Sequence, residues 1–489
     1  MRTRSIDLAE AEQEEALRLT KKRRRSGEGD ELSATVVKKP STSQRTASEF
    51  CKEHNIQISG PPGFICPNPM ETFGSTPFSQ KTLSIFTTAG YTAPTVTQAL
   101  AWPIALSGVN IVSVAKTGSG KTLGFLLPVF QALQARPEQG GRGPKSPALL
   151  VMAPTRELAC QIEVEAAKFG RPLGLRSACV YGGAPKSLQI RQIRDGVDVI
   201  IGTPGRLQDL MDMGVLSLQG VKFLVLDEAD CMLDMGFEQE IRSIVSKISS
   251  ARQTLLFTAT WPRSIQRLAA EFAPSPVQFS LGDTDTLAAN KSIAQTVEVV
   301  SGNDAKVDKL RALLTNLHMV DGVVKPDHGK TIIFVKFKAS CNRVAEDLWG
   351  AGFYVNTLHG DMEQRERTQV IGDFRTGKLR VIVATDVAAR GLDVKDVTDV
   401  INFDMAGTVE DYVHRIGRTG RAGAQGRSHT FFDPKVDGKN AFELIKVLEG
   451  AKQAVNPDLA ALASRGRGGG GGGGKGRWGG GRGGGGRRW

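Results

Sequence analysis

Short apolar runs, separated by longer amphipathic stretches, recur between residues 110 and 432 of the chain. Runs of this length flanked by helical stretches are typical of strands in parallel sheets, because such strands are covered on both faces. This alternation therefore predicts βαβ units and an α/β fold. The runs are Asn110–Ala115, Ala148–Ala153, Val197–Ile201, Val221–Leu226 and Thr254–Thr258, and then Thr331–Val335, Val355–Leu358, Val381–Ala384, Val400–Phe403 and Ser428–Phe432.

The composition of the 489-residue chain is that of an ordinary globular protein, with 40% hydrophobic and 23% charged residues. No apolar run reaches the ~18 residues needed to cross a bilayer, so we expect no membrane partner. The first seven residues include the charged Arg2, Arg4 and Asp7 and lead to no apolar segment, which disfavours a signal peptide. Six cysteines, none in a C-x-x-C pair, indicate free thiols in a reducing compartment: Cys51, Cys66, Cys160, Cys179, Cys231 and Cys341.

Positive charge is concentrated at the C-terminal end. Residues 465–489 contain 16 Gly, six Arg, one Lys, two Trp and no acid, so they carry seven of the twelve net positive charges. A segment of this composition cannot bury a core and should be disordered. Arginine beside glycine and tryptophan favours contact with the phosphates and stacking on the bases of a nucleic acid, although a flexible linker or solubilising end is the alternative.

The N-terminal region contains a basic cluster, Lys21–Arg25, after a group of glutamates. This cluster is compatible with a nuclear localisation signal and equally with a solvated helix end. The Ser- and Thr-rich residues 26–48 have the composition of a linker.

A glycine loop follows the first apolar run and precedes a second apolar stretch that can form a helix. Strand, glycine loop and helix form the context of a phosphate-binding P-loop, in which backbone N–H groups and the helix dipole face the phosphates. Lys121 can reach the β- and γ-phosphates, and the Thr122 hydroxyl can ligate Mg²⁺. The alternative is a plain glycine turn. The loop residues are Ala115, Lys116, Thr117, Gly118, Ser119, Gly120, Lys121 and Thr122, and Ala115 stands where the general pattern has glycine.

An acidic group follows the run Val221–Leu226. Carboxylates at the C-terminal end of a parallel strand lie beside a P-loop on the same sheet. We expect Asp227 to hold Mg²⁺ and Glu228 to orient and deprotonate the attacking water. A surface acidic turn would be the alternative if the strand and the P-loop were absent.

These segments resemble the DEAD-box RNA helicases, and further segments match that family in order over residues 70–455. The matching segments are Gly90–Gln98, Ala115–Thr122, Pro154–Ala159, Gly182–Gly183, Thr203–Arg206, Asp227–Asp230, Thr258–Thr260, Ala384–Asp393 and Tyr412–Arg421. Thr258-Ala259-Thr260 departs from the usual Ser-Ala-Thr but keeps a hydroxyl.

The resemblance implies two tandem RecA-like, P-loop NTPase-type domains, each a parallel sheet flanked by helices. The expected boundaries are an N-terminal extension (1–69, largely disordered), domain 1 (70–282), a linker (283–294), domain 2 (295–455) and a Gly/Arg-rich tail (456–489). It also implies that ATP and Mg²⁺ are ligands and that RNA is the partner. The expected enzyme activity is ATP hydrolysis stimulated by RNA.

The resemblance assigns roles to nucleotide-binding residues in both domains. Gln98 would contact adenine, supported by Phe73 and by Tyr91, although Phe73 alone could be an ordinary buried aromatic. From the second domain, Gly391 and Asp393 would contact the nucleotide. Arg418 and Arg421, three residues apart and so on one face of a helix, would reach the γ-phosphate as arginine fingers; a solvated basic face is the alternative. We expect His414 to be a core or cleft histidine, and we assign it no acid–base role.

The resemblance also predicts RNA contacts and a coupling group. Arg156, Gly183, Thr203 and Arg206 of the first domain, with Gly360 and Thr385 of the second, would hold the sugar-phosphate backbone without reading sequence. Asp230, Thr258 and Thr260 would couple the nucleotide site to this surface.

The function predicted is an ATP-dependent RNA helicase that unwinds locally as two domains close on ATP and RNA. A clamp or annealing factor in mRNA metabolism is the alternative, and a DNA helicase is disfavoured by the motif set. Phe50–Glu53, Leu256–Pro262 and Leu281–Asp285 resemble a nucleolar subgroup acting in pre-ribosomal RNA processing. We therefore expect a monomer in the nucleus or nucleolus, with the cytoplasm as the alternative.

Overall fold

The computed structural model describes residues 45–115, 118–135, 146–281, 292–320, 323–324, 329–389, 394, 396–421 and 424–467. The expectations for residues 1–44, for most of the interdomain linker and for the tail beyond residue 467 lie outside these residues. Within them, each of the ten predicted strands is present, with ends that differ from the prediction by at most three residues.

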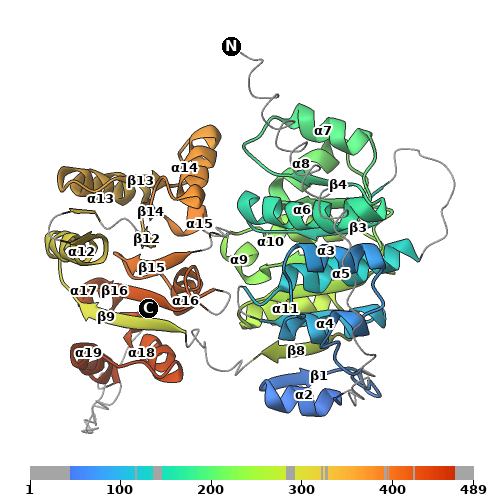
Figure 1. Ribbon diagram of the computed structural model, residues 1–489, viewed down its shortest axis with the longest axis horizontal. Helices are drawn as coiled ribbons and strands as arrows, with labels where there is room; N and C mark the ends of the chain where they lie inside the picture. The colour runs from blue at the N-terminus through green and yellow to red at the C-terminus, as the bar shows by residue number, and fades with distance from the viewer. Residues whose placement is uncertain are drawn as a thin grey trace, which may run out of the picture. The chain divides into compact units, whose positions relative to one another are not determined.

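The first sheet has eight strands in the order β1-β8-β2-β7-β6-β3-β5-β4 (Figure 1). All neighbours are parallel except β1 and β8, which are antiparallel. The carboxyl ends of β2, β3, β5, β6 and β7 therefore lie along one edge, where the loops that follow them can form a site. The strands are β1 (Ile56–Ser59), β2 (Ile111–Val114), β3 (Leu149–Met152), β4 (Ser177–Val180), β5 (Val199–Gly202), β6 (Phe223–Asp227), β7 (Gln253–Thr258) and β8 (Val277–Leu281).

Successive residues of the central strands point to two separate cores, one on each face of the first sheet. Leu149 and Val151 belong to one cluster with Phe125 and Ile162, whereas Leu150 and Met152 belong to the other with Leu207. Because both faces are covered by helices, these strands are buried throughout and apolar at nearly every position, which is why their sequence lacks polar alternation.

The helices of the first domain cover both faces of this sheet. Helices α4, α5 and α6 pack on one face and α8, α10 and α11 on the other. Their bounds are α3 (Gln80–Thr88), α4 (Val96–Leu106), α5 (Lys121–Gln134), α6 (Arg156–Gly170), α7 (Lys186–Arg194), α8 (Pro204–Asp212), α9 (Ala229–Asp234), α10 (Glu238–Val245) and α11 (Arg263–Phe272). No helix in the described part of the chain combines the length and apolarity required to span a membrane.

Residues 45–69 correct the expectation of a largely disordered extension. Helix α2 (Ala47–Glu53) starts at a capping box formed by Thr46 and Glu49, and buries Phe50. Strand β1 then pairs with β8, from Ile56 opposite Leu281 to Ser59 opposite Gln278. The first sheet therefore extends further toward the N-terminus than the apolar runs indicate.

The second sheet has six strands in the order β13-β14-β12-β15-β16-β9, all parallel. They are β9 (Ile293–Val299), β12 (Lys330–Phe334), β13 (Val355–Leu358), β14 (Val381–Ala384), β15 (Val397–Asn402) and β16 (Gly426–Phe432). A separate two-stranded ribbon joins β10 (Met319–Val320) to β11 (Val323–Val324). Residue 293 belongs to β9, so the expected linker overlaps the start of this sheet.

Helices again cover both faces of the second sheet. Ile333 and Val383 face a core with α12 and α13, whereas Ile332 and Ile382 face a core with α14. The bounds are α12 (Asn303–His318), α13 (Lys338–Gly350), α14 (Gln364–Thr376), α15 (Asp386–Ala389), α16 (Val409–Ile416), α17 (Pro434–Asp437) and α18 (Ala441–Gly450).

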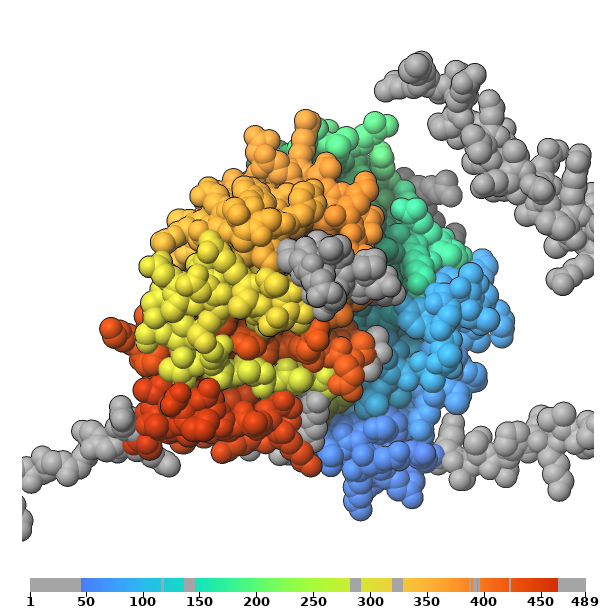
Figure 2. Space-filling view, turned by 60° about the vertical axis from the view of Figure 1, so that its left-hand side comes forward, coloured from blue at the N-terminus to red at the C-terminus, as the bar shows by residue number. Residues whose placement is uncertain are grey.

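The start of the predicted tail is helical. Helix α19 (Pro457–Arg467) places Leu459 in a core with Leu444 of α18 and Ile293 of β9. Figure 2 shows these two C-terminal helices in red beside β9. The second domain therefore continues past residue 455, the predicted boundary.

Candidate nucleotide and RNA site

The glycine loop joins β2 to α5, as the sequence predicts. Ala115 extends β2 and donates its N–H to the Thr258 carbonyl at 2.9 Å. Gly120 adopts φ +84°, which ends the loop and allows α5 to begin at Lys121. The buried Lys121 turns back over the loop and its Nζ donates to the Ala115 carbonyl at 3.1 Å.

Gln98 is hydrogen-bonded to this loop from the start of α4. Thr95 and Gln98 form a capping box at the start of α4, in which the Gln98 Oε1 accepts from the Thr95 N–H at 3.0 Å. The Gln98 Nε2 donates to the Gly120 carbonyl at 3.0 Å, and the Thr95 hydroxyl donates to the Ser119 carbonyl at 2.8 Å. The predicted contact of Gln98 with adenine remains a prediction, and the structure adds that the same side chain is bonded to the loop.

Two buried polar atoms at the site have no hydrogen-bond partner among the described residues. They are the Ser119 hydroxyl in the loop and the Glu228 Oε2 at the end of β6. Such atoms are rare in folded proteins unless a ligand or water satisfies them. Gly118, at φ +79°, has open space where a Cβ would project. The loop, with its helix N-terminus and Lys121, fits a polyphosphate ligand.

The acidic pair occupies the end of β6, beside the loop. Asp227 is buried, and this burial raises the pKa of its carboxyl to about 7; Glu228 acts in the same direction, while the Lys121 charge opposes the rise. Glu228 caps α9 with a left-handed backbone, φ +50°, and donates its N–H to the Asp227 Oδ1 at 3.0 Å. Asp227 and the hydroxyl of Thr122, the second residue of α5, are oxygen donors of the kind Mg²⁺ prefers. The donor set therefore fits the ion.

Asp230 connects this acidic segment to the Thr-Ala-Thr segment. Its Oδ2 accepts from the Thr260 hydroxyl at 2.8 Å and from the N–H groups of Thr260 and Ala259 at 2.9 and 3.1 Å. Burial alone would raise the pKa of Asp230, but His414, Lys121 and the Thr260 hydroxyl together lower it below its ordinary value. Thr258 reaches the group only indirectly, because its hydroxyl donates to the Thr260 carbonyl at 3.0 Å.

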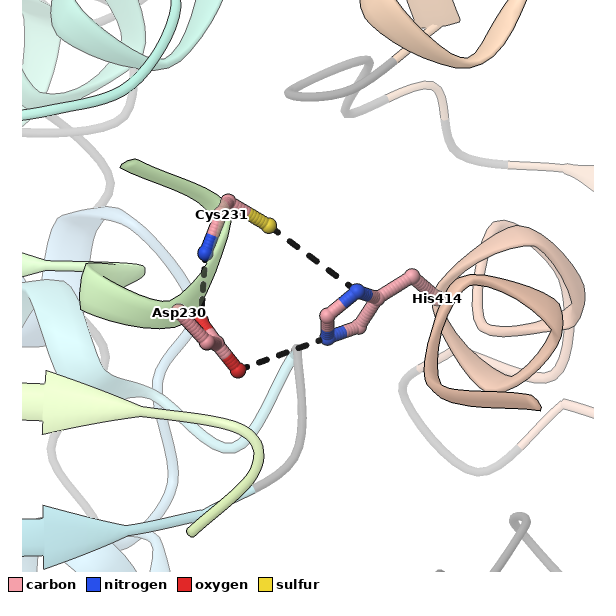
Figure 3. A group of neighbouring side chains, drawn as sticks. All are labelled: Asp230, Cys231 and His414. Carbon is pink, nitrogen blue, oxygen red and sulfur yellow. Dashed lines mark hydrogen bonds and ion pairs between the residues drawn. The ribbon is translucent and has the colours of Figure 1, made fainter. Parts of the chain in front are cut away.

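Figure 3 shows that His414 of α16 points at the same carboxylate. Its Nε2 lies 3.7 Å from the Asp230 Oδ2, and its Nδ1 lies 3.9 Å from the Cys231 sulfur. These side-chain types can bind transition metals, but both Asp230 oxygens already accept hydrogen bonds. We therefore interpret the group as a contact between the two domains. The sequence predicts a core or cleft position for His414 without an acid–base role, and nothing in the chain signals a partner so many residues away.

A second contact between the two domains joins α14 to α6, and the sequence does not predict it. The Arg367 guanidinium of α14 donates to the Glu157 carboxylate of α6 at 2.8 Å, and both side chains are largely buried. Glu157 directly follows Arg156, one of the predicted RNA-binding residues.

Arg418 and Arg421 do not lie on a helix, contrary to the prediction. Helix α16 ends at Ile416, and the chain turns through Gly417 and through Gly420 at φ +64°. The Arg418 Nε donates to the His414 carbonyl at 3.2 Å and the Arg421 Nε to the Gly417 carbonyl at 3.0 Å. The two glycines release the chain from the helix, and the arginines are held by the carbonyls of the last turn instead.

The first-domain residues predicted to contact RNA lie on neighbouring loops. The Arg156 guanidinium stacks on the Tyr181 ring at 4.3 Å, and its Nη1 has no hydrogen-bond partner among the described residues although it is buried. Thr203 stands at the N-cap position of α8 without a side-chain cap bond. Both side chains therefore retain donors or acceptors for a ligand.

The Arg206 side chain, unlike those of Arg156 and Thr203, is bonded to other groups of the first domain. Its guanidinium is buried and donates to the Ala184 carbonyl at 3.2 Å and to the Gln189 Oε1 at 2.9 Å. Ala184 directly follows Gly183, which adopts φ +75°. Arg206 therefore fixes the glycine loop, and direct contact of Arg206 with RNA remains a prediction.

In the second domain, Gly360 and Thr385 follow β13 and β14. Thr385 is buried and its N–H donates to the Leu358 carbonyl at 3.1 Å, so the two loops are joined. A Cβ on Gly360 would lie 3.7 Å from the Lys338 side chain. These positions agree with a shared surface at the carboxyl edge of the sheet.

The aromatic residues assigned to adenine behave partly as core residues. The Phe73 ring stacks on Phe86 with 4.1 Å between centroids and also faces Trp102. Tyr91 is 40% exposed and packs edge-on against Phe86. The remaining nucleotide-binding predictions, Lys116, Thr117, Gly391 and Asp393, lie outside the described residues.

Comparison with known proteins identifies the family. Residues 95–268 match the DEAD/DEAH box helicase family, and residues 305–423 match the helicase conserved C-terminal domain. The chain is 47% identical over 447 residues to DEAD-box ATP-dependent RNA helicase 14 of Arabidopsis thaliana, covering 90% of this chain and 70% of that protein. The chain belongs to the DEAD-box RNA helicase family. Another DEAD-box relative, RNA helicase 46 of the same plant, is 48% identical over 85% of this chain, which spans 62% of its length.

A solved structure has a similar fold to this chain. S. cerevisiae Dbp5 bound to RNA and ADP BeF3 aligns with 81% of this chain and 99% of its own, with a TM-score of 0.67 and 27% identity. The two parallel-sheet domains described above are therefore the RecA-like pair of a DEAD-box protein.

Proposed function

We propose that this DEAD-box protein is an RNA-stimulated ATPase that locally unwinds or remodels RNA. The observation that carries the proposal is the buried group formed by Lys121, Asp227 and Glu228, in which the Glu228 Oε2 has no partner among the described residues. The relatives named as ATP-dependent RNA helicases, and the Dbp5 structure with RNA and ADP BeF3, support the same reaction.

The chemistry follows from the positions of these side chains. Lys121 and the N–H groups at the start of α5 bind the triphosphate of ATP. Glu228 orients a water and accepts its proton as the oxygen attacks the γ-phosphorus, while the bond to the β-phosphate oxygen breaks to release ADP and phosphate. A bound Mg²⁺, held by Asp227 and Thr122, would neutralise phosphate charge and keep the Asp227 carboxylate ionised despite its burial.

Coupling between the domains rests on the Asp230–His414 contact. Asp230 stands two residues after Glu228, and the His414 carbonyl accepts from the Arg418 Nε. A change at the γ-phosphate therefore reaches the second domain through a short, buried chain of groups. We infer that ATP binding by both domains closes them and that hydrolysis reopens them.

RNA would be bound by its backbone. Arg156 and Thr203 have donors or acceptors to spare, and Arg206 holds the Gly183 loop beside them. Such contacts position a strand without reading its sequence. Closure would bend the bound strand so that a paired partner no longer fits, which yields local unwinding.

The test is ATP turnover and strand displacement by Glu228→Gln. Because the amide cannot take up the proton, hydrolysis should fall by at least about 100-fold while ATP and RNA binding persist. Lys121→Ala is the matched variant and should instead lose ATP binding. Turnover by the Glu228 variant at the wild-type rate would contradict the proposal.

Substrate class is tested in the same assay. ATPase activity should rise with single-stranded RNA and not with single-stranded DNA, and a short RNA duplex should be displaced. Stimulation by RNA without displacement would favour the clamp or annealing function. Stimulation by single-stranded DNA alone would overturn the assignment to RNA.

We further propose a place in ribosomal RNA processing in the nucleus or nucleolus. The support is the sequence resemblance of Phe50–Glu53 and Leu256–Pro262 to the nucleolar subgroup. Crosslinking of bound RNAs in cells should recover pre-ribosomal RNA. Recovery of messenger RNA in the cytoplasm would overturn this placement and leave the ATPase proposal intact.

A further inference from the structure

Helix α6 and edge strand β4 are joined by three successive side-chain pairs. The first is Arg156 stacked on Tyr181 at 4.3 Å, and the third is the Ser177 hydroxyl, which donates to the Glu163 Oε1 at 2.9 Å. Residue numbers rise along the helix as they fall along the strand, so the two elements run antiparallel. The helix advances about 6 Å from Arg156 to Cys160 and about 4.5 Å from Cys160 to Glu163, while each step of two strand residues advances about 6.6 Å, so the three pairs stay roughly in register.

The middle pair consists of two cysteines. Cys160 lies one helical turn after Arg156, and Cys179 lies two residues before Tyr181. The pairs on either side fix the register, so the two thiols face one another between α6 and β4. Both are free and only partly buried, so a small reagent can reach them.

The surroundings activate one of the two sulfurs. The hydrogen bond from Cys179 lowers the pKa of Cys160 to about 7, and the charge of Arg156 and the Tyr181 hydroxyl act in the same direction against the effect of burial. The pKa of Cys179 is raised, first by its hydrogen bond to Cys160 and then by burial. One thiol is therefore suited to attack and the other to resolve.

We propose that Cys160 and Cys179 form a peroxide-sensitive dithiol, a modification site that closes to a disulfide beside Arg156. The Cys160 thiolate attacks one peroxide oxygen, so that an S–O bond forms, the O–O bond breaks and hydroxide leaves, taking up the Cys160 proton as water. The Cys179 sulfur then attacks the Cys160 sulfur. The S–S bond forms, the S–O bond breaks, and the departing oxygen takes the Cys179 proton as a second water. Two thiols are oxidised by two electrons, and one peroxide is reduced to two waters.

The disulfide would alter the RNA surface. A disulfide bond is about 2 Å long, which is shorter than any contact between two thiols, so its formation draws the second turn of α6, which carries Cys160, and with it the adjoining first turn toward β4. Arg156 lies on that turn and is held on its side by the Tyr181 ring. Its guanidinium is then displaced from the phosphate it binds. This consequence rests on the proposed RNA contact, whereas disulfide formation does not.

The experiment uses the full chain treated with hydrogen peroxide, then catalase, alkylation and trypsin. Cleavage after Arg156, Lys168, Arg176 and Lys186 places the two cysteines in separate peptides, 157–168 and 177–186. Mass spectrometry should find these peptides linked, with two hydrogens lost, and separated again by dithiothreitol. The oxidised protein should bind a single-stranded RNA oligonucleotide, in the presence of a non-hydrolysable ATP analogue, roughly threefold or more weakly, with recovery on reduction.

Cys66→Ser is the matched control. Cys66 is also partly buried, but burial raises the pKa of its thiol to about 11, so this variant should respond to peroxide as the wild type does. Cys160→Ser and Cys179→Ser should give no linked peptide and RNA affinities that peroxide does not change.

Absence of the linked peptide, or equal oxidation of Cys66, would overturn the proposal. A linked peptide with unchanged RNA affinity would overturn the effect on Arg156. Failure of the reduced protein to bind RNA would instead contradict the proposed function.

Discussion

The main chain of Gly120 passes so close to Gln98 that a Cβ at position 120 would lie 2.6 Å from the Gln98 Nε2. The same atom would lie 2.6 Å from the Thr95 hydroxyl. Because Gln98 and Thr95 are themselves bonded to the loop carbonyls, neither can move away without breaking those bonds. The phosphate loop and the start of α4 thus form one packed unit.

Gly120→Ala should destabilise the nucleotide-free protein more than Gly118→Ala does. Both positions have positive φ, so both variants incur backbone strain of about 1–2 kcal/mol. Only at position 120 does the added methyl group meet other atoms, since nothing lies within 4 Å at position 118. Thermal unfolding of the two variants measures the difference in stability. Equal midpoints would show that Thr95 and Gln98 move away from the added methyl group without loss of stability.

Asp227 should make the stability of the nucleotide-free protein depend on pH. Its pKa is raised to about 7 in the fold, mainly by burial, against an ordinary value of 3.8. The folded state therefore holds a proton that the unfolded state releases. The stability this provides is complete below about pH 4 and is lost as the pH rises through 7.

Asp227→Asn lacks this titration, so its stability relative to the wild type should increase from about pH 5 to pH 8 by up to a few kcal/mol. Denaturation of both proteins in EDTA without nucleotide measures the change. Parallel curves across this range would contradict the raised pKa.

The Arg367–Glu157 pair should matter most when both domains are engaged. Arg367→Ala leaves a largely buried carboxylate without its partner, so RNA affinity in the presence of a non-hydrolysable ATP analogue should fall by about tenfold. Combining Arg367→Glu with Glu157→Arg should restore part of the loss. Lys446→Ala, which breaks the exposed pair with Glu443, should have no effect. An equal loss of RNA affinity in the absence of nucleotide would show that the effect does not depend on engagement of both domains.

Removal of residues 465–489 should weaken RNA binding and flatten its salt dependence. Seven positive charges are lost, so the slope of log affinity against log salt should decrease by at most about 5 for a single strand. A tail of equal length with its seven basic residues replaced by Gln separates charge from length. Identical slopes for all three proteins would reduce the tail to a solubility segment.

The central strands were predictable because burial on both faces leaves them continuously apolar. The runs around Ile111 and Val225 are of this kind, and the glycine loop and acidic pair that follow them are local signals. Strand β1 was not predictable in this way, since it lies at the sheet edge and only Ile56 is fully buried. Its pairing with β8 is set by residues more than 200 positions away.

The coupling groups were harder to predict for the same reason. Thr95 and Gln98 carry a readable capping-box spacing, but nothing local shows that Gln98 also binds the Gly120 carbonyl. The turn after Ile416 depends on two glycines within a segment whose spacing suggests a helix. Asp230 and His414 meet only because the two sheets bring them together.

The pairing of β1 with β8 also protects the edge of the first sheet. On its other side β8 is bonded to β2, so without β1 its outer N–H and C=O groups would face solvent in a row. An unpaired edge of this kind is a template for a strand of another molecule. A fragment that starts at residue 70 would therefore tend to self-associate even if its ATP site were intact, whereas one that starts at residue 45 would keep this border closed.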